Sequence, residues 1–483
     1  MIDLKALAAR QMTVAGLLPD FDASVKAEVA QLPKAPASEA GIVDLRDLLW
    51  SSIDNDESRD LDQIEVTEAL PSGATKVLVG IADVDRLVKK DSPIDRHAAK
   101  NTTSVYTGIV MFPMLPEILS TDLTSLNQDV DRAAVVTELE VAADGTLTRS
   151  TVYRALVRNK AQLAYNGVGA WLAGTAPPPA KVAANPALAE ELRRQDAVAQ
   201  KLRAIRYAHG ALDLTTIEAN PVVKDGVVTA LEVSEQNRAR ELIEDVMIAA
   251  NTAMAEFISA AGRSVLERVV KEPERWARIV ALAASLQETL PAAPSSQALS
   301  AFLKKRHDKD PDHFPDLSLT IVKLMGPGEY IVQKPGAAHE GHFGLAVDDY
   351  THSTAPNRRF ADLVTQRMLK ALLAKQPSPY DDAALAAVAT HCNEQAAASR
   401  KLERFMRKAA AAVLLSHRIG DSFDAIVTGA SDKGTYARLL SPPAEGRVVK
   451  GDKGMQVGDR VRVKLTRVVP EKGFIDFDGG KGD

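Results

Sequence analysis

Residues 53–63 constrain this chain more than any other stretch, because they concentrate negative charge between apolar flanks. The segment reads I-D-N-D-E-S-R-D-L-D-Q, and its acidic residues are Asp54, Asp56, Glu57, Asp60 and Asp62. Carboxylates this close together repel one another unless a cation or a cationic side chain balances them. The segment is therefore a candidate metal site.

Three interpretations of the acidic segment are open from its own residues. An EF-hand calcium loop fits the spacing of oxygen-bearing side chains from Asp54 to Glu65, but Arg59 stands where that loop needs glycine. A solvated acidic loop is the common alternative. The third is a two-metal site for phosphodiester hydrolysis, since hard divalent cations prefer carboxylate oxygens. On extended backbone Asp60 and Asp62 would point to one side and share the ions with Asp54.

A second segment, H-S-T-A-P-N-R-R-F-A-D-L, supplies a candidate cation for the same chemistry. Its pattern predicts a helix with Ser353 or Thr354 as the cap and Pro356 in the first turn. Arg358 and Arg359 would then emerge at a helix N-terminus, which attracts anions, and a guanidinium can hold two phosphate oxygens. Alone, such a pair more often forms surface salt bridges. The two segments therefore matter mainly together.

The composition is that of an ordinary globular protein, with 46% apolar and 25% charged residues among 483. A formal net charge of −5 gives no global reason to bind nucleic acid, so such a site must be a local basic surface. The single cysteine, Cys392, excludes an intramolecular disulfide and fits a reducing compartment. Neither a signal peptide nor a membrane-spanning run is evident, so we expect a cytoplasmic protein.

Periodicity predicts strand pairs and some helices up to residue 233 and mainly helices from there to residue 416. The expected hairpins join 64–70 to 75–84, 136–141 to 146–153, and 220–223 to 227–233. The first of them would place the acidic segment at the edge of a sheet. Helices are expected within 3–33 and over 188–207, 237–261, 274–286, 297–306, 356–373 and 381–416.

After Gly420 the chain changes to five short alternating segments with glycine or Asp/Lys turns, which predict a small five-stranded barrel of the OB type. The fourth segment carries Arg460, Arg462 and Lys464 on one face, where they could track a phosphate backbone. A basic run at 400–408 precedes the barrel, and a solvated helix face is its simpler explanation.

Together these segments resemble the ribonuclease II and ribonuclease R family, in which an RNB catalytic domain precedes an S1 domain of OB fold. The resemblance lies in blocks that occur in family order across about residues 44–410. They are S-I-D-N-D-E-S-R-D-L-D-Q, G-I-A-D-V, T-S-V-Y-T-G, A-Q-L-A-Y-N, E-L-I-E-D-V, H-F-G-L-A-V-D-D-Y-T-H and S-T-A-P-N-R-R-F-A-D-L.

The resemblance implies an α+β fold in which mixed sheets and helices surround an RNA channel. We expect an RNB domain over 44–415 and an S1 barrel over 416–483. Residues 1–43 would form a short helical region, either a cap on the main domain or a helix-turn-helix-like contact.

The implied activity is a Mg²⁺-dependent, hydrolytic and processive 3′→5′ exoribonuclease that degrades single-stranded RNA to nucleoside 5′-monophosphates. Two Mg²⁺ ions are expected, with Mn²⁺ as a substitute, and the protein would act as a monomer without a membrane partner.

The matching positions imply roles for individual residues. The expected catalytic residues are Asp54, Asp60, Asp62 and Arg358, and the expected metal ligands are Asp54, Asp60, Asp62 and Gln63. Tyr106 would stack on a base at the 3′ end. The other residues expected to bind RNA are Tyr165, Glu244 (or its neighbour Asp245), Arg359, Glu403, Arg460, Arg462 and Lys464.

Three departures from the family pattern stand out. Gln63 replaces a further aspartate, which removes a formal charge and should weaken binding of the second ion. Leu214 stands where the family often has phenylalanine. About 43 residues precede the first block, where many members carry two cold-shock domains.

The rival hypothesis is an RNA-binding protein that keeps this fold without catalysis, and only Gln63 favours it.

Overall fold

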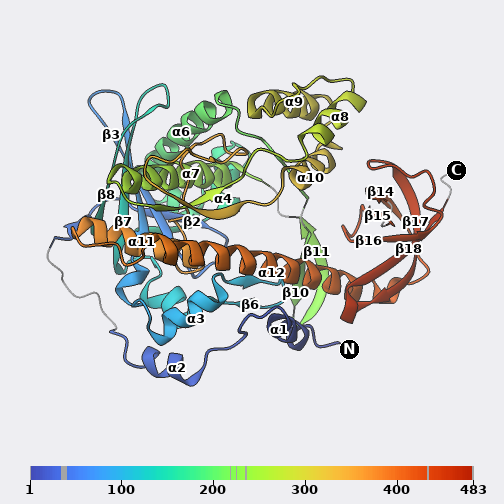
Figure 1. Ribbon diagram of the computed structural model, residues 1–483, viewed down its shortest axis with the longest axis horizontal. Helices are drawn as coiled ribbons and strands as arrows, with labels where there is room; N and C mark the ends of the chain where they lie inside the picture. The colour runs from blue at the N-terminus through green and yellow to red at the C-terminus, as the bar shows by residue number, and fades with distance from the viewer. Residues whose placement is uncertain are drawn as a thin grey trace.

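The computed structural model describes residues 2–33, 41–217, 219–224, 226–233, 236–431 and 434–480. A body built on a seven-stranded sheet and a small closed barrel lie toward opposite ends of the long helix α12 (Asp382–Leu415), as Figure 1 shows. This architecture confirms the α+β class that the sequence predicts. Within the described part of the chain, no helix is long and apolar enough to cross a membrane.

The central sheet has the strand order β1-β8-β7-β4-β3-β2-β9. Its strands are β1 (Val43–Asp44), β2 (Ser51–Asp54), β3 (Gln63–Ala69), β4 (Thr75–Ala82), β7 (Asp131–Val141), β8 (Leu147–Arg158) and β9 (Ala161–Ala164). The expected hairpins β3-β4 and β7-β8 are both present and antiparallel. The turn of the second needs its glycine: Gly145 has φ +96°, and an added Cβ would lie 2.7 Å from the Lys201 carbonyl oxygen.

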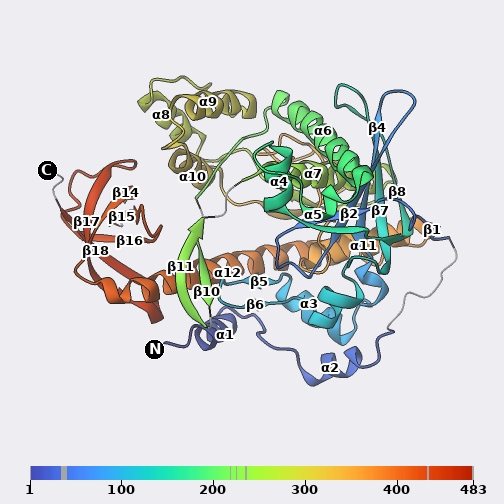
Figure 2. The same cartoon turned by 180° about the vertical axis from the view of Figure 1, so that it is seen from behind.

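Apolar cores cover both faces of this sheet, which explains why β3 and β4 are buried along most of their length. On one face Trp50 and Ile64 pack with Phe360 of α11 (Phe360–Leu373). On the other face Ile53 packs with residues of α6 (Pro186–Ala208) and α7 (Arg238–Ala260). Figure 2 shows α4, α6 and α7 gathered on that side of the sheet. The loop between β2 and β3 therefore starts from a rigid support.

Most of the expected helices are found within a few residues of their predicted bounds. The remaining helices are α1 (Leu4–Val14), α2 (Ala23–Val29), α3 (Pro93–Asn101), α4 (Tyr165–Leu172), α5 (Ala180–Ala183), α8 (Trp276–Ser285), α9 (Ser296–Lys309) and α10 (Phe314–Met325). Short helical turns lie at Val84–Arg86, Ile118–Leu123, Ser416–Arg418 and Pro470–Lys472. The sequence pattern did not predict α3, α4, α5 or α10.

Three small two-stranded sheets complete the body. They pair β5 (Val105–Tyr106) with β6 (Met111–Phe112), β10 (Ala219–Lys224) with β11 (Val227–Val233), and β12 (Val265–Val269) with β13 (Glu329–Gln333). The predicted β10-β11 hairpin is confirmed, although Asp225 of its turn lies outside the described residues. Leu7 and Met12 of α1 share a core with Val105, Phe112 and Met406, which joins the N-terminal helix to β5, β6 and α12.

The C-terminal strands form the predicted five-stranded closed barrel. They are β14 (Ser422–Ser431), β15 (Gly434–Leu439), β16 (Glu445–Lys450), β17 (Arg460–Val469) and β18 (Phe474–Gly480). Gly446 is required by close packing, because an added Cβ would lie 2.5 Å from the Ile475 carbonyl oxygen. Ala412 and Leu415 at the end of α12 belong to the barrel's own core, so the helix is anchored in the barrel.

Candidate active site

The acidic segment forms the loop between β2 and β3, two adjacent inner strands of the central sheet. The prediction that it lies at a sheet edge is therefore wrong, because β9 pairs in parallel outside β2 and covers it. Asp54, the last residue of β2, is 8% exposed, and its Oδ1 accepts hydrogen bonds from the Asn55 backbone N–H at 2.7 Å and the Ser58 hydroxyl at 3.0 Å. These bonds fix one carboxylate at the strand end.

Asp62 lies at the other end of the loop and is fully buried. Its Oδ1 accepts a hydrogen bond from the Asn357 backbone N–H at 3.0 Å, and its Oδ2 lies 3.1 Å from Nε of Arg358. Burial raises the pKa of Asp62 to about 7, and the Arg358 charge opposes that rise. The neighbourhood therefore supplies less positive charge than this carboxylate requires.

Asp60 stands between these groups and Tyr106. The Tyr106 hydroxyl lies 3.5 Å from Oδ2 of Asp60, at the limit of a hydrogen bond, while the Tyr106 side chain is 44% exposed. Burial raises the pKa of Asp60, and Arg358 opposes that rise. The structure thus brings Asp54, Asp60, Asp62, Arg358 and Tyr106 into one centre.

The helix after the arginine pair begins later than predicted. Arg359 occupies the N-cap of α11, so Arg358 lies in the turn before the helix. Ser353 and Thr354 do not cap α11, because both side chains hydrogen-bond to Asn251 of α7. Backbone turns and Asp62 therefore position Arg358, without help from the first turn of a helix.

Arg359 is held differently from Arg358. Its guanidinium donates to both carboxylate oxygens of Asp362, at 2.8 and 2.7 Å. The charge of Arg359 is thus shared with a buried acid, and less of it is available to a ligand than the sequence suggested. Its side chain still lines a cavity beside the acidic loop.

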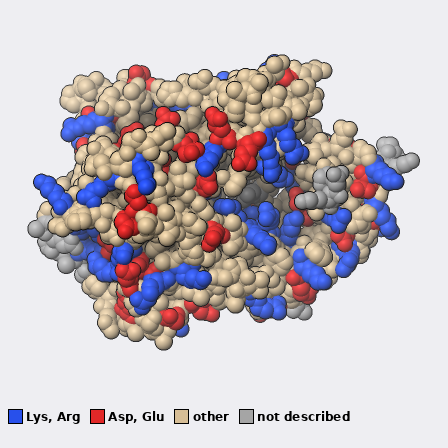
Figure 3. Space-filling view, in the orientation of Figure 1, with Lys and Arg blue, Asp and Glu red and all other residues tan. Residues whose placement is uncertain are grey.

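That cavity has a volume of about 410 Å³ and a strongly basic lining. Its charged and aromatic lining residues are Tyr106, Arg268, Tyr330, His352, Arg358, Arg359, Arg400 and Glu403. Glu403 on α12 accepts hydrogen bonds from the Tyr106 backbone N–H at 3.2 Å and the Ser399 hydroxyl at 3.0 Å. Figure 3 shows Lys and Arg side chains around a hollow between the body and the barrel. A polyanion could enter this region with its phosphates facing cations.

Sequence reasoning missed two groups near this centre. Arg268 follows Glu267 in the otherwise apolar strand β12, and its guanidinium lies 4.8 Å from the Tyr330 ring centre. Glu65 on β3 is fully buried, and neither of its oxygens has a hydrogen-bond partner in the described part of the chain. Burial, followed by the Asp54 charge, raises its pKa well above the usual value. The only sequence signal for each was a charge at a position that apolar neighbours predict to be buried.

Tyr165 lies next to the acidic loop, because Ala164 of β9 pairs with Asp54 of β2, and Glu244 lies on α7. Tyr165 begins α4 directly after β9, and the Arg240 guanidinium lies 4.5 Å from its ring centre. Glu244 is exposed on α7, whereas its neighbour Asp245 is buried and paired with Arg206. Glu244 is thus the member of this pair that is free to contact a ligand.

The predicted basic face of the barrel is exposed on β17. Arg460, Arg462 and Lys464 alternate with the more buried Val461 and Val463. The Arg462 guanidinium also pairs with Asp424 at 2.9 Å.

The side chains of the acidic loop fit the binding of a hard divalent cation. Asp54, Asp60 and Asp62 offer carboxylate oxygens, which Mg²⁺ prefers. Oδ2 of Asp62 is buried and pairs with Arg358, but among the described residues it has no partner with hydrogen-bond geometry. Gln63, which follows Asp62, is 4% exposed at the start of β3 and carries an uncharged amide.

Comparison with known proteins identifies the family of this site. Residues 42–375 match the RNB domain model. The chain belongs to the RNB family. Residues 421–478 of this RNB protein match the RNase II-type exonuclease C-terminal S1 domain, so the chain is of the ribonuclease II and R type. Leu214, where the family often has phenylalanine, packs in a cluster that includes Phe302 and Phe314.

Curated relatives agree with this assignment at modest identity. The RNB protein is 29% identical to Ribonuclease R of Escherichia coli (strain K12) over 496 residues, which cover 94% of this chain and 59% of that protein. It is 28% identical to Ribonuclease R of Aquifex aeolicus (strain VF5) over 467 residues, covering 90% of this chain and 64% of that protein. The chain therefore spans less than two thirds of the length of these relatives.

Solved structures show the same fold. The RNase R of Mycoplasma genitalium in complex with ribose-methylated single-stranded RNA superposes with a TM-score of 0.89 at 23% identity, covering 99% of this chain and 78% of the other. Yeast Ssd1, described as a pseudonuclease, superposes with a TM-score of 0.72 at 17% identity, covering 96% of this chain and 58% of the other. Because an inactive protein shares the fold, activity must be argued from the site.

Proposed function

We propose that this RNB protein is a Mg²⁺-dependent, hydrolytic and processive 3′→5′ exoribonuclease that degrades single-stranded RNA to nucleoside 5′-monophosphates. One observation carries the proposal: three carboxylates, Asp54, Asp60 and Asp62, meet Arg358 at one end of a cavity lined by further arginines. Phosphodiester hydrolysis needs both kinds of charge within a few ångströms. Carboxylates hold the cation that activates the attacking water, and an arginine holds the phosphate.

The chain's own residues would act on the last phosphodiester of the RNA. Arg358 would donate hydrogen bonds to the phosphate and stabilise the charge that develops on its oxygens. Tyr106 would stack on a terminal base. Water would add to phosphorus as the bond from phosphorus to the 3′ oxygen breaks, which releases a nucleoside 5′-monophosphate and leaves a new 3′ hydroxyl. Mg²⁺ held by the three aspartates, with Gln63 as a weaker ligand, would activate the water and stabilise the leaving oxygen.

Other residues would hold the RNA outside the reacting bond. Arg359, Arg268 and Glu403 line the cavity. Tyr165 and Glu244 would contact the 3′ nucleotide. The barrel face with Arg460, Arg462 and Lys464 would bind RNA before it enters. We propose the domain division 1–43, 44–415 and 416–483 for this arrangement, with a single chain as the active unit.

The rival function is RNA binding without cleavage. Gln63 favours it, because a charge is missing from the metal site, and so does the fold's occurrence in a pseudonuclease. Against it stands the intact grouping of Asp54, Asp62 and Arg358. A catalytically decayed site would not need these groups in this geometry.

A labelled-RNA assay separates the two functions. Wild-type protein with 5′-labelled single-stranded RNA should produce progressive 3′ shortening with Mg²⁺ and none with EDTA. Asp62→Asn should abolish shortening while RNA affinity stays within about threefold, and Asp47→Asn, at an exposed position before β2, should behave as the wild type. Binding without shortening by the wild-type protein would establish the rival function.

A further inference from the structure

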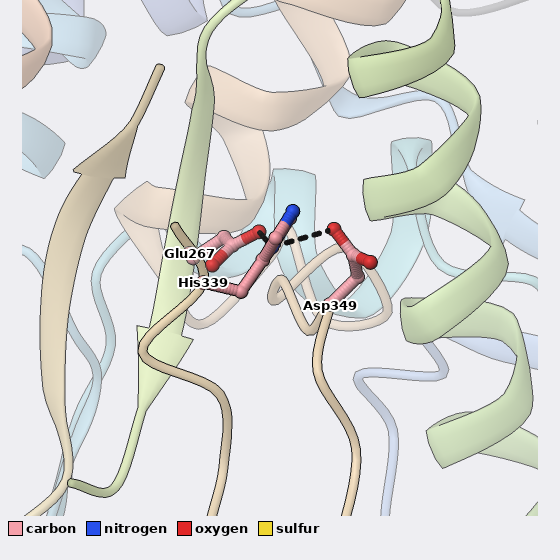
Figure 4. A group of neighbouring side chains, drawn as sticks. All are labelled: Glu267, His339 and Asp349. Atoms are coloured by element: carbon pink, nitrogen blue, oxygen red, sulfur yellow. Dashed lines mark ion pairs between the residues drawn. The ribbon is translucent and has the colours of Figure 1, made fainter. Parts of the chain in front are cut away.

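A second cluster of candidate metal ligands lies outside the acidic loop. Glu267 comes from β12, while His339 and Asp349 come from the segment after β13, and Figure 4 shows the three side chains converging. Nδ1 of His339 lies 3.2 Å from Oδ1 of Asp349 and 3.8 Å from Oε1 of Glu267. One potential ligand atom from each residue lies within 4.8 Å of the others.

The Glu267 carboxylate is the observation that points to a bound cation. Its side chain is fully buried, and neither oxygen has a hydrogen-bond partner among the described residues. A buried acid of this kind is costly unless a proton or a cation neutralises it.

The surrounding backbone keeps Glu267 in place. Glu267 pairs with Ile331 of β13 on one side and with Thr351 on the other. These backbone pairings fix the face of the local sheet from which the Glu267 side chain projects. On α7, the exposed Glu256 adds a carboxylate that interacts electrostatically with Asp349. The site is therefore rich in negative charge on more than one element.

We propose that Glu267, His339 and Asp349 bind one zinc-class divalent ion at a site separate from the acidic loop. The ligand chemistry favours this class, because an imidazole nitrogen with carboxylate oxygens suits Zn²⁺ and similar first-row ions better than Mg²⁺. Ligands about 2.1 Å from a tetrahedral zinc ion lie roughly 3.4 Å apart, which small side-chain movements of this cluster can reach. Water would occupy the fourth position.

The ion would connect two parts of the chain that lead to the RNA cavity. Glu267 precedes Arg268, which lines the cavity, and Asp349 precedes the segment that ends at Arg358. The Arg268 backbone N–H also donates to the Tyr350 carbonyl at 2.7 Å. Closing the loop that carries His339 onto β12 would hold these segments together, which is a structural role independent of the proposed catalysis.

Metal binding can be measured without RNA. Full-length protein without a polyhistidine tag would be dialysed against Zn²⁺ in the presence of excess Mg²⁺, and the retained zinc would be determined by elemental analysis. We expect one zinc ion per chain for the wild type and for Asp62→Asn. His339→Ala and Glu267→Gln should bind Zn²⁺ at least about tenfold more weakly.

Asp348→Asn, an exposed neighbour of Asp349, is the matched control and should retain zinc. Zn²⁺ should also raise the thermal unfolding temperature of the wild type but not of His339→Ala. His339 lies on a partly exposed loop, so its alanine variant tests the site even if the buried Glu267→Gln variant fails to fold. Equal zinc retention by the wild type and His339→Ala, or no stoichiometric zinc in the wild type, would overturn the proposal.

Discussion

Arg358 and Asp62 form an ion pair at the centre of the molecule, with Nε of the arginine 3.1 Å from Oδ2 of a fully buried aspartate. The Asn357 backbone N–H binds the other oxygen of the same carboxylate. These contacts join the loop after β2 to the turn before α11, two segments that are distant in sequence. The proposed reaction therefore depends on a contact that also connects the sheet to α11.

Replacement of Arg358 should separate catalysis from stability. Arg358→Lys keeps a positive charge beside Asp62 but loses the planar fork, so the single-turnover rate of RNA shortening should fall by about 100-fold or more. Arg358→Ala leaves a buried carboxylate unpaired and should also lower the free energy of unfolding by about 3 kcal/mol. Urea denaturation measures the second effect.

The control for this pair of variants is Arg149→Lys on β8, where 70% of the side chain is exposed. It should retain both the rate and the stability of the wild type. A cleavage rate for Arg358→Lys within about threefold of the wild type would show that the paired donors of Arg358 are not needed.

Gln63→Asp should restore the charge that the metal site lacks. Without Mg²⁺ the variant should unfold more readily than the wild type, because the new carboxylate is buried beside Asp62. With Mg²⁺ it should reach half-maximal activity at a several-fold lower concentration. Mg²⁺ titration of RNA shortening measures this shift, and Gln63→Asn is the uncharged control. An unchanged Mg²⁺ requirement would indicate that Gln63 does not contact the ion.

Local patterns were sufficient to predict much of the fold. Alternating residues around Gly145 and Gly226 indicated hairpins that are present, since strand period and turn chemistry are encoded by neighbours. Short motifs also identified the acidic loop and the turn that carries Arg358. The barrel followed from the even spacing of its strands.

The predictions that were wrong concerned side chains whose partners come from distant parts of the chain. Ser353 and Thr354 have the composition of helix caps, but Asn251 on α7 takes their side chains, so α11 starts at Phe360 instead. Arg268 reaches the cavity beside Arg358 because β12 pairs with β13, which packs against α12. The positions of these side chains depend on tertiary contacts, which the periodicity of the sequence does not encode.

Tyr106 provides a test of base stacking. Tyr106→Ala should lower the affinity for single-stranded RNA by about 1–3 kcal/mol, because an exposed aromatic face is lost at the cavity. Tyr106→Phe should keep the affinity, since the hydroxyl contact with Asp60 is long, at 3.5 Å. Binding is measured with labelled RNA in EDTA, where no cleavage occurs. Equal losses in both variants would assign the role to the hydroxyl and exclude stacking.

His342 should make the protein less stable in acid. Burial, followed by the Arg268 charge, lowers its pKa to about 4, and its Nδ1 accepts a hydrogen bond from the Leu345 backbone N–H at 3.1 Å. Between about pH 6.5 and 4 the unfolded chain binds a proton that the folded chain excludes, so the free energy of unfolding decreases as pH falls.

His342→Asn keeps an acceptor oxygen but cannot titrate. Between pH 7 and 5 its free energy of unfolding should therefore fall by about 2 kcal/mol less than that of the wild type. Urea denaturation in EDTA at both pH values measures the difference, and His417→Asn, at an exposed position, should follow the wild type. Identical pH dependence of wild type and His342→Asn would mean that His342 is protonated equally in both states.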